Sequence, residues 1–168
     1  MTAKDLETLF DYSYWANRRL FAAVAQLTPQ QFMQPVAGNH GSIRKTLVHM
    51  LSAEWGWLGR CAGPERGATL NPEDFPTLDS LLETWNQVEA SMRQLLSNLQ
   101  DEDLARNVEF TLGGGQKRSM PVEELLQHAA NHGAHHRGQV SLLLRLVGAN
   151  PGDFDILFYF AEKRSLRA

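Results

Sequence analysis

The sequence predicts an all-α protein built as a four-helix bundle, and three observations support this prediction. Four long segments of comparable length carry apolar residues at helical spacing. The chain has 168 residues, which is enough for one domain with a sizeable hydrophobic core. Its composition is that of a globular protein, with 43% hydrophobic and 21% charged residues. We therefore expect a single domain over residues 1–168.

The first two long helices are expected on either side of a short helical turn. Over residues 4–26 the apolar stripe is interrupted by Asn17, whose side chain should therefore face the interior. Thr28 and Pro29 suit the N-cap and the first position of the helical turn that follows. The second long helix is expected over residues 42–61.

The third long helix, over residues 78–99, has the most regular apolar period. The fourth, over residues 121–147, begins with a proline and is closed by Gly148, as is common at helix ends. Between these helices, residues 108–112 alternate in character and a run of three glycines follows. Residues 116–120 are expected to return as the second strand of a small β-hairpin.

A short terminal helix is expected after Pro151, with Asp153 as its N-cap. The links that precede the third and fourth long helices are long for plain up-down hairpins. A connection that crosses over the bundle is compatible with these lengths, which do not fix the connectivity.

Charge and composition exclude several classes of protein. The net charge of -3 gives no electrostatic case for a nucleic-acid partner. The single cysteine, Cys61, excludes an intrachain disulfide and suits a small buried position in a reducing environment. No apolar run approaches about 18 residues, and the N-terminus lacks the apolar core of a signal peptide. We expect a cytoplasmic protein that does not bind membranes.

Two histidines of the fourth helix point to a buried metal site. At about 100° per residue, His136 projects near the middle of the apolar stripe and His132 lies about 40° to one side. Imidazoles on a core-facing stripe are costly without partners, and a divalent cation satisfies both. His128 falls at the edge of the stripe and His135 well outside it. Gly133 replaces the glutamate of a His-Glu-x-x-His motif, which disfavours a metalloprotease.

A third ligand must come from another element, and the spacing leaves several candidates. On the second helix, His49 lies on a flank of small residues that leave room for an ion. Glu54 projects near the centre of the apolar stripe, where it can bind the ion or accept a hydrogen bond from an imidazole. Spacing favours His49 only modestly. The other candidates are His128, His40, Asp11 and Glu89.

Three segments resemble the DinB family, a group of metal-binding proteins with mostly unassigned reactions. They are Asn131-His132-Gly-Ala-His135-His136-Arg137-Gly138-Gln139, Tyr14-Trp15-Ala16-Asn17 and Ser42-Ile43-Arg-Lys-Thr46-Leu47-Val-His49. The resemblance covers nearly the whole chain. It implies an up-down-down-up four-helix bundle, often dimeric, and a divalent metal bound by His49, His132 and His136. Around these ligands we expect Glu54, His128, Asn17 and Gln139 to support the ligands or to line the site.

Three histidine ligands leave at least one coordination position for water or substrate, which is typical of catalytic sites. The expected function is a metal-dependent enzyme that activates a thiol or water, and no further catalytic residue is identified. Related branches of the superfamily are thiol S-transferases and isomerases that use low-molecular-weight thiols. The alternatives are a metal-dependent hydrolase and a non-catalytic, metal-binding stress-response protein. Three imidazoles suit zinc, nickel, iron and copper, and we expect one of the first three. The expected partners are a small-molecule substrate, such as a low-molecular-weight thiol, and a second copy of the chain.

Overall fold

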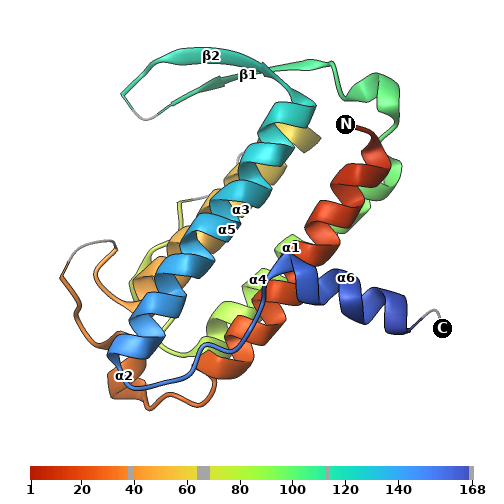
Figure 1. Cartoon of the computed structure of the whole chain (residues 1–168). Coiled ribbons are helices and arrows are strands. Elements are labelled where there is room, and N and C mark those ends of the chain that lie inside the picture. Colours follow the sequence, from red (N-terminus) through yellow and green to blue (C-terminus); the bar gives the residue numbers. More distant parts are fainter. Residues whose placement is uncertain (38–39, 64–68, 113, 167–168) are drawn as a thin grey trace.

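The computed structural model describes residues 1–37, 40–63, 69–112 and 114–166, and the chain is mostly helical (Figure 1). Each of the four predicted long helices is present, with ends within two residues of those expected. They are α1 (Ala3–Val24), α3 (Ile43–Ala62), α4 (Leu78–Asn98) and α5 (Val122–Leu146). The shorter elements are α2 (Pro29–Met33), α6 (Ile156–Ser165), the single-turn helices η1 (Pro72–Asp74) and η2 (Asp101–Asp103), and the strands β1 (Asn107–Thr111) and β2 (Lys117–Pro121).

The long helices share one hydrophobic core. Helix α1 packs against α4 and α5, and α3 packs against the same two helices. Their apolar stripes meet in the middle, where many of the aliphatic side chains are fully buried. The largest fully buried side chains include Leu6, Leu20, Leu47, Leu51, Leu81, Trp85, Met92, Leu125 and Leu126. This core holds the facing surfaces of α3 and α5 at a fixed separation, and the candidate site lies between these two helices.

Local capping explains where the first helices begin. The Thr2 side chain accepts a hydrogen bond from the backbone of Asp5, and the Asp5 carboxylate accepts one from the backbone of Thr2. Thr28 and Gln31 form the same reciprocal pair at α2, which confirms the predicted helical turn. Ser42 caps α3. Because this cap fixes the first turn of α3, it also fixes the angular position of every side chain further along the helix.

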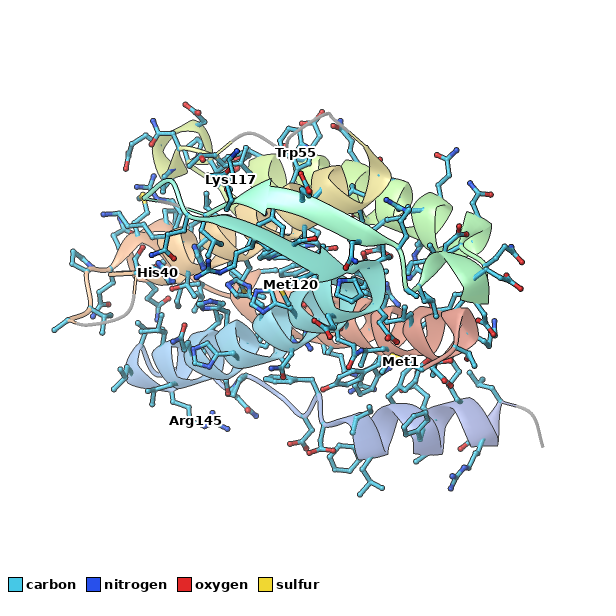
Figure 2. The ribbon with its side chains drawn as sticks, turned by 90° about the horizontal axis from the view of Figure 1, so that it is seen from above. Met1, His40, Trp55, Lys117, Met120 and Arg145 are labelled. Carbon is cyan, nitrogen blue, oxygen red and sulfur yellow. The ribbon has the colours of Figure 1, made fainter. Side chains whose placement is uncertain are left out.

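The predicted hairpin is present between α4 and α5, shifted by one residue. Strands β1 and β2 pair antiparallel, with Glu109 opposite Ser119. The hairpin lies across one end of α3 and α5, at the top of Figure 1, and Met120 marks strand β2 in the view from above in Figure 2. Phe110 is buried on the Trp57 ring, with centroids 5.6 Å apart. Gly113, the first residue of the predicted glycine turn, lies outside the described residues.

The terminal helix starts two residues later than predicted, because Asp155 rather than Asp153 is its N-cap. The Asp155 carboxylate accepts a hydrogen bond from the backbone of Leu157 at 2.8 Å. Upstream, the carbonyl of Phe154 accepts a hydrogen bond from Tyr12 of α1, so this carbonyl is engaged outside the helix. Among the described residues, no helix is both long enough and apolar enough to span a membrane.

Candidate metal centre

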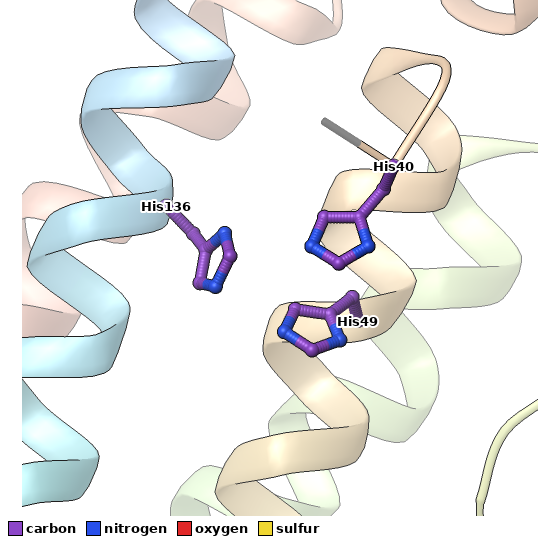
Figure 3. A group of neighbouring side chains, drawn as sticks. All are labelled: His40, His49 and His136. Carbon is purple, nitrogen blue, oxygen red and sulfur yellow. The ribbon is translucent and has the colours of Figure 1, made fainter. Parts of the chain in front are cut away.

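Four histidine side chains come together between α3, α5 and the loop that precedes α3. His49 comes from α3, His132 and His136 come from α5, and His40 precedes the N-cap of α3. In Figure 3 the ring of His136 points across from α5 toward the rings of His40 and His49. The ring centroids of His49 and His136 are 4.6 Å apart. The chain therefore gathers four of its six histidines in one place.

The two α5 histidines face the same way, as their spacing predicted. His136 is buried, with 5% of its surface exposed, and His132 is half-buried. Their Nε2 atoms are 3.1 Å apart. Residues four positions apart start about 5–6 Å from each other on a helix, so the two rings converge from their backbone positions.

His49 joins this pair from the facing helix. Its Nε2 atom lies 3.2 Å from that of His132. Ligand nitrogens that share one tetrahedral zinc ion at 2.0–2.1 Å are about 3.3 Å apart, and neighbouring nitrogens of an octahedral ion are about 3.0 Å apart. The measured separations of 3.1 and 3.2 Å lie between these values. These two separations, both of them to His132, are compatible with ligands that share one divalent ion.

His40 is the fourth imidazole. Among the described residues, ring nitrogens of His40, His49 and His136 all lie within 4.8 Å of one another, so these three residues are also positioned to hold a metal ion. The His40 ring stacks on His49 with centroids 3.9 Å apart and an interplanar angle of 21°. Sequence reasoning placed His40 only among the further candidates, because a loop residue has no helical phase from which its direction can be predicted.

The imidazoles are uncharged at neutral pH and can donate lone pairs. Burial, together with the charges of neighbouring histidines, lowers the pKa of His49 to about 4 and the pKa of His132 to about 4. Burial also lowers the pKa of His40 and His136. The Gln139 side-chain oxygen accepts a hydrogen bond from Nδ1 of His136 at 2.5 Å. With the proton on Nδ1, Nε2 of His136 is free to bind a cation.

Glu54 has a different partner from the one that was expected. Its carboxylate accepts a hydrogen bond from the Tyr14 hydroxyl of α1 at 2.7 Å, rather than one from an imidazole. Burial raises the pKa of Glu54 to about 7, although the Tyr14 hydrogen bond and the charge of Arg137 oppose this effect. Asn17 faces the interior as predicted, and its side-chain oxygen accepts a hydrogen bond from Arg137 at 3.1 Å. These residues form a polar group beside the histidines.

A small cavity connects this polar group to the histidine cluster. It has a volume of about 10 Å³, enough for one water molecule, and its lining includes Glu54, Arg137 and His132. One nitrogen atom of a residue that lines it, Nη2 of Arg137, is buried without a hydrogen-bond partner among the described residues. Buried polar atoms normally have partners, so this cavity is suited to a bound water molecule.

The remaining candidates lie further from the cluster centre. His128 is exposed, with its ring 4.7 Å from that of Trp57 and 5.8 Å from that of His132. The exposed His135 contacts the side-chain nitrogen of Gln139 at 2.9 Å. Asp11 and Glu89 both form ion pairs with Arg93, at 2.7 and 2.9 Å. Cys61 is buried as expected, and burial raises the pKa of its thiol to about 11.

Comparison with known proteins gives the same family as the sequence motifs. The DinB family model matches residues 1–165. The chain is 24% identical over 166 residues to Protein DinB of Bacillus subtilis, covering 92% of this chain and 94% of that protein. It is 26% identical over 144 residues to the uncharacterized protein YizA of the same organism, covering 84% and 87%. The crystal structure of a DinB-like protein from Bacillus cereus matches with a TM-score of 0.75 at 22% identity. The match covers 90% of this chain and 97% of that chain, so the two proteins share a fold. Because the family model extends over nearly the whole sequence, the chain belongs to the DinB family.

Proposed function

We propose that the chain binds one divalent metal ion through His49, His132 and His136, and that it is a metal-dependent enzyme acting on a thiol. The observation that carries this proposal is the convergence of three uncharged imidazoles, whose Nε2 atoms are separated by 3.1 and 3.2 Å along the series His136, His132, His49. The family match and the group formed by His40, His49 and His136 are compatible with metal binding. The ion is zinc, nickel or iron, since imidazole suits all three.

The chain's own residues position the donors. The helix backbone holds His132 and His136 one turn apart, and Gln139 fixes the ring of His136 through Nδ1. When bound, a divalent ion stabilises the thiolate form of a thiol that reaches it. His49 and His132 are half-buried, so part of each side chain is exposed to solvent. These features support a thiol S-transferase or isomerase that uses a low-molecular-weight thiol.

No side chain is assigned as a base. Glu54 has a pKa of about 7, suitable for proton transfer near neutral pH, but its carboxylate is engaged by Tyr14. His128 is exposed beside Trp57. Both are therefore proposed as residues near the site that support it or line its approach, and the proton of an incoming thiol is expected to leave through solvent.

A second candidate function is supported by His40. A fourth imidazole within reach of the cluster can complete a tetrahedral coordination sphere, and closed four-ligand sites are typical of structural metals. This observation favours a non-catalytic, metal-binding stress-response protein. For either function we propose a cytoplasmic homodimer without a nucleic-acid partner. The dimer follows from the family resemblance, and the single cysteine and the net charge of -3 support the other two expectations.

Metal analysis of single alanine variants tests the ligand set. His49→Ala, His132→Ala and His136→Ala are each expected to abolish stoichiometric metal binding, whereas His135→Ala should retain it, since its exposed ring faces Gln139. Full metal occupancy in His136→Ala would overturn the assignment.

Cobalt substitution then tests the reaction class. A sulfur-to-cobalt charge-transfer band on adding a thiol supports the transferase or isomerase, whereas a response to a hydroxamate alone favours the hydrolase.

A further inference from the structure

We propose that His40 is a displaceable fourth ligand of the same ion, which closes the site at rest and must leave before a thiol can bind. The inference rests on the proposed function, because it assumes that His49, His132 and His136 hold the ion. In this proposal His40, which lies in the loop before α3, controls the access of a thiol to the ion.

His40 lies directly against the proposed ligands, although it comes from a loop and not from a helix. Its ring stacks face to face on His49, at 3.9 Å between centroids, and lies 5.2 Å from the ring of His136 (Figure 3). A ring nitrogen of His40 lies within 4.8 Å of ring nitrogens of His49 and His136, so His40 is within reach of an ion that these residues hold. A ligand pair on one tetrahedral ion needs about 3.3 Å, so a small movement of the His40 ring brings it into coordination.

The backbone around His40 differs from that around the other three histidines. His49, His132 and His136 are in the middle of α3 and α5, where helix hydrogen bonds fix the backbone. His40 is in a loop, followed by Gly41 with φ of 91° and no atoms within 4 Å of where a Cβ would lie. Its ring can therefore move away from the ion without breaking a helix. His40 is also only half-buried.

The exchange of ligands is chemically balanced. Four imidazoles fill a tetrahedral coordination sphere, so a thiol cannot enter without the loss of one of them. In the exchange, the bond from the ion to the His40 nitrogen breaks, a bond to sulfur forms, and the thiol proton passes to the buffer. Thiolate sulfur is a softer and negatively charged donor, so it competes well with a neutral imidazole on a late divalent metal.

Because His40 would compete with the thiol for the ion, removing His40 is expected to change metal affinity and thiol affinity in opposite directions. Without His40 the ion has one donor fewer, so metal binding should weaken. Thiol binding should tighten, because the apparent dissociation constant is the intrinsic one divided by the open fraction. If the closed state accounts for 90–99% of the molecules at rest, removing His40 tightens thiol binding by about 10- to 100-fold. A merely structural histidine would not move the two constants in opposite directions.

The test uses the full-length protein loaded with cobalt(II), titrated with 2-mercaptoethanol and followed by absorption. His40→Ala is compared with wild type and with the exposed-histidine control His135→Ala, and helical circular dichroism checks the fold of each. His40→Asn serves as a second variant if the alanine variant does not fold. The expected result is a changed ligand-field spectrum before thiol is added, weaker cobalt binding and tighter thiol binding in the His40 variant alone.

Two results would overturn the proposal. Identical cobalt spectra and thiol affinities in wild type and the His40 variant would show that His40 is not a ligand. Complete loss of cobalt from the variant would show that His40 is an obligatory ligand and not a displaceable one. Failure of the proposed function is distinguishable from both. In that case no form binds thiol, while the spectral change before thiol addition still reports whether His40 coordinates the ion.

Discussion

Glu54→Gln is expected to remove a pH-dependent loss of stability from the metal-free protein. Glu54 accepts the Tyr14 hydrogen bond at 2.7 Å, and burial raises its pKa to about 7. Glutamine has nearly the same shape, and its side-chain oxygen can accept the same hydrogen bond, but it does not ionise. The substitution therefore removes the titration and keeps the contact.

The sign and size of the effect follow from proton linkage. The folded state binds the Glu54 proton more tightly than the unfolded state, in which the pKa returns to its ordinary value of 4.5. The free energy of unfolding of wild type therefore falls as the pH rises from 4.5 through 7. At about 1.36 kcal/mol per tenfold difference in proton affinity, the full loss is about 3.4 kcal/mol. Since the side chain keeps some contact with solvent, we expect about 2–3 kcal/mol.

Urea denaturation followed by circular dichroism measures this effect in the presence of a chelator. Wild type and Glu54→Gln are compared at about pH 5 and about pH 8, on either side of the folded-state pKa. The histidines titrate in the opposite sense, because burial lowers the pKa of His49 and His132 to about 4. Their contribution is lost as the pH falls from 6.5 toward 4, and it cancels because both proteins contain them.

The variant should be close to wild type in stability at about pH 5 and more stable by about 2–3 kcal/mol at about pH 8. A difference between the two proteins that does not change with pH would refute the reasoning. It would show that Glu54 ionises as easily in the folded protein as in the unfolded chain. A variant destabilised at both pH values would show that glutamine does not replace the contact with Tyr14.

Three further predictions concern the metal and the core. Gln139→Leu should weaken metal binding by about 10- to 100-fold in a competition titration, because the His136 ring loses its partner at Nδ1. Free metal at 100 times its dissociation constant should stabilise the protein by about 2.7 kcal/mol, while the metal-free form keeps its helical circular dichroism. Leu126→Ala should cost about 2–5 kcal/mol in urea denaturation, since this side chain is fully buried, whereas Leu142→Ala, at a side chain 58% exposed, should change stability by less than about 0.5 kcal/mol.

The bounds of the long helices followed from signals that lie within each helix. Apolar stripes and local caps such as Thr28 and Ser42 act over a few residues, so the bounds could be predicted to within two residues. The convergence of His132 and His136 is local in the same sense, since one helix sets their separation. The terminal cap was misplaced because the hydrogen bond from Tyr12 to the Phe154 carbonyl comes from a distant helix. The up-down-down-up order of helix directions stays a prediction.

Glu54 and His40 show what helical periodicity cannot supply. Glu54 was expected to face inward, but its partner Tyr14 lies 40 residues away on α1, and the relative rotation of two helices is not encoded in the phase of either. His40 lies outside any helix, so its approach to His49 depends on the path of the loop. His40 was therefore one candidate ligand among several, and no sequence pattern placed it next to His49.

The contact between His49 and His132 joins residues 83 positions apart in the chain. An ion held by both would act as a staple between α3 and α5, and it would stabilise the folded state by mass action because its ligands come together only in that state. Unlike a disulfide, such a staple needs no oxidising surroundings, and it can be removed and restored by a chelator and metal. The stability of the folded chain would then depend on the supply of metal rather than on redox conditions.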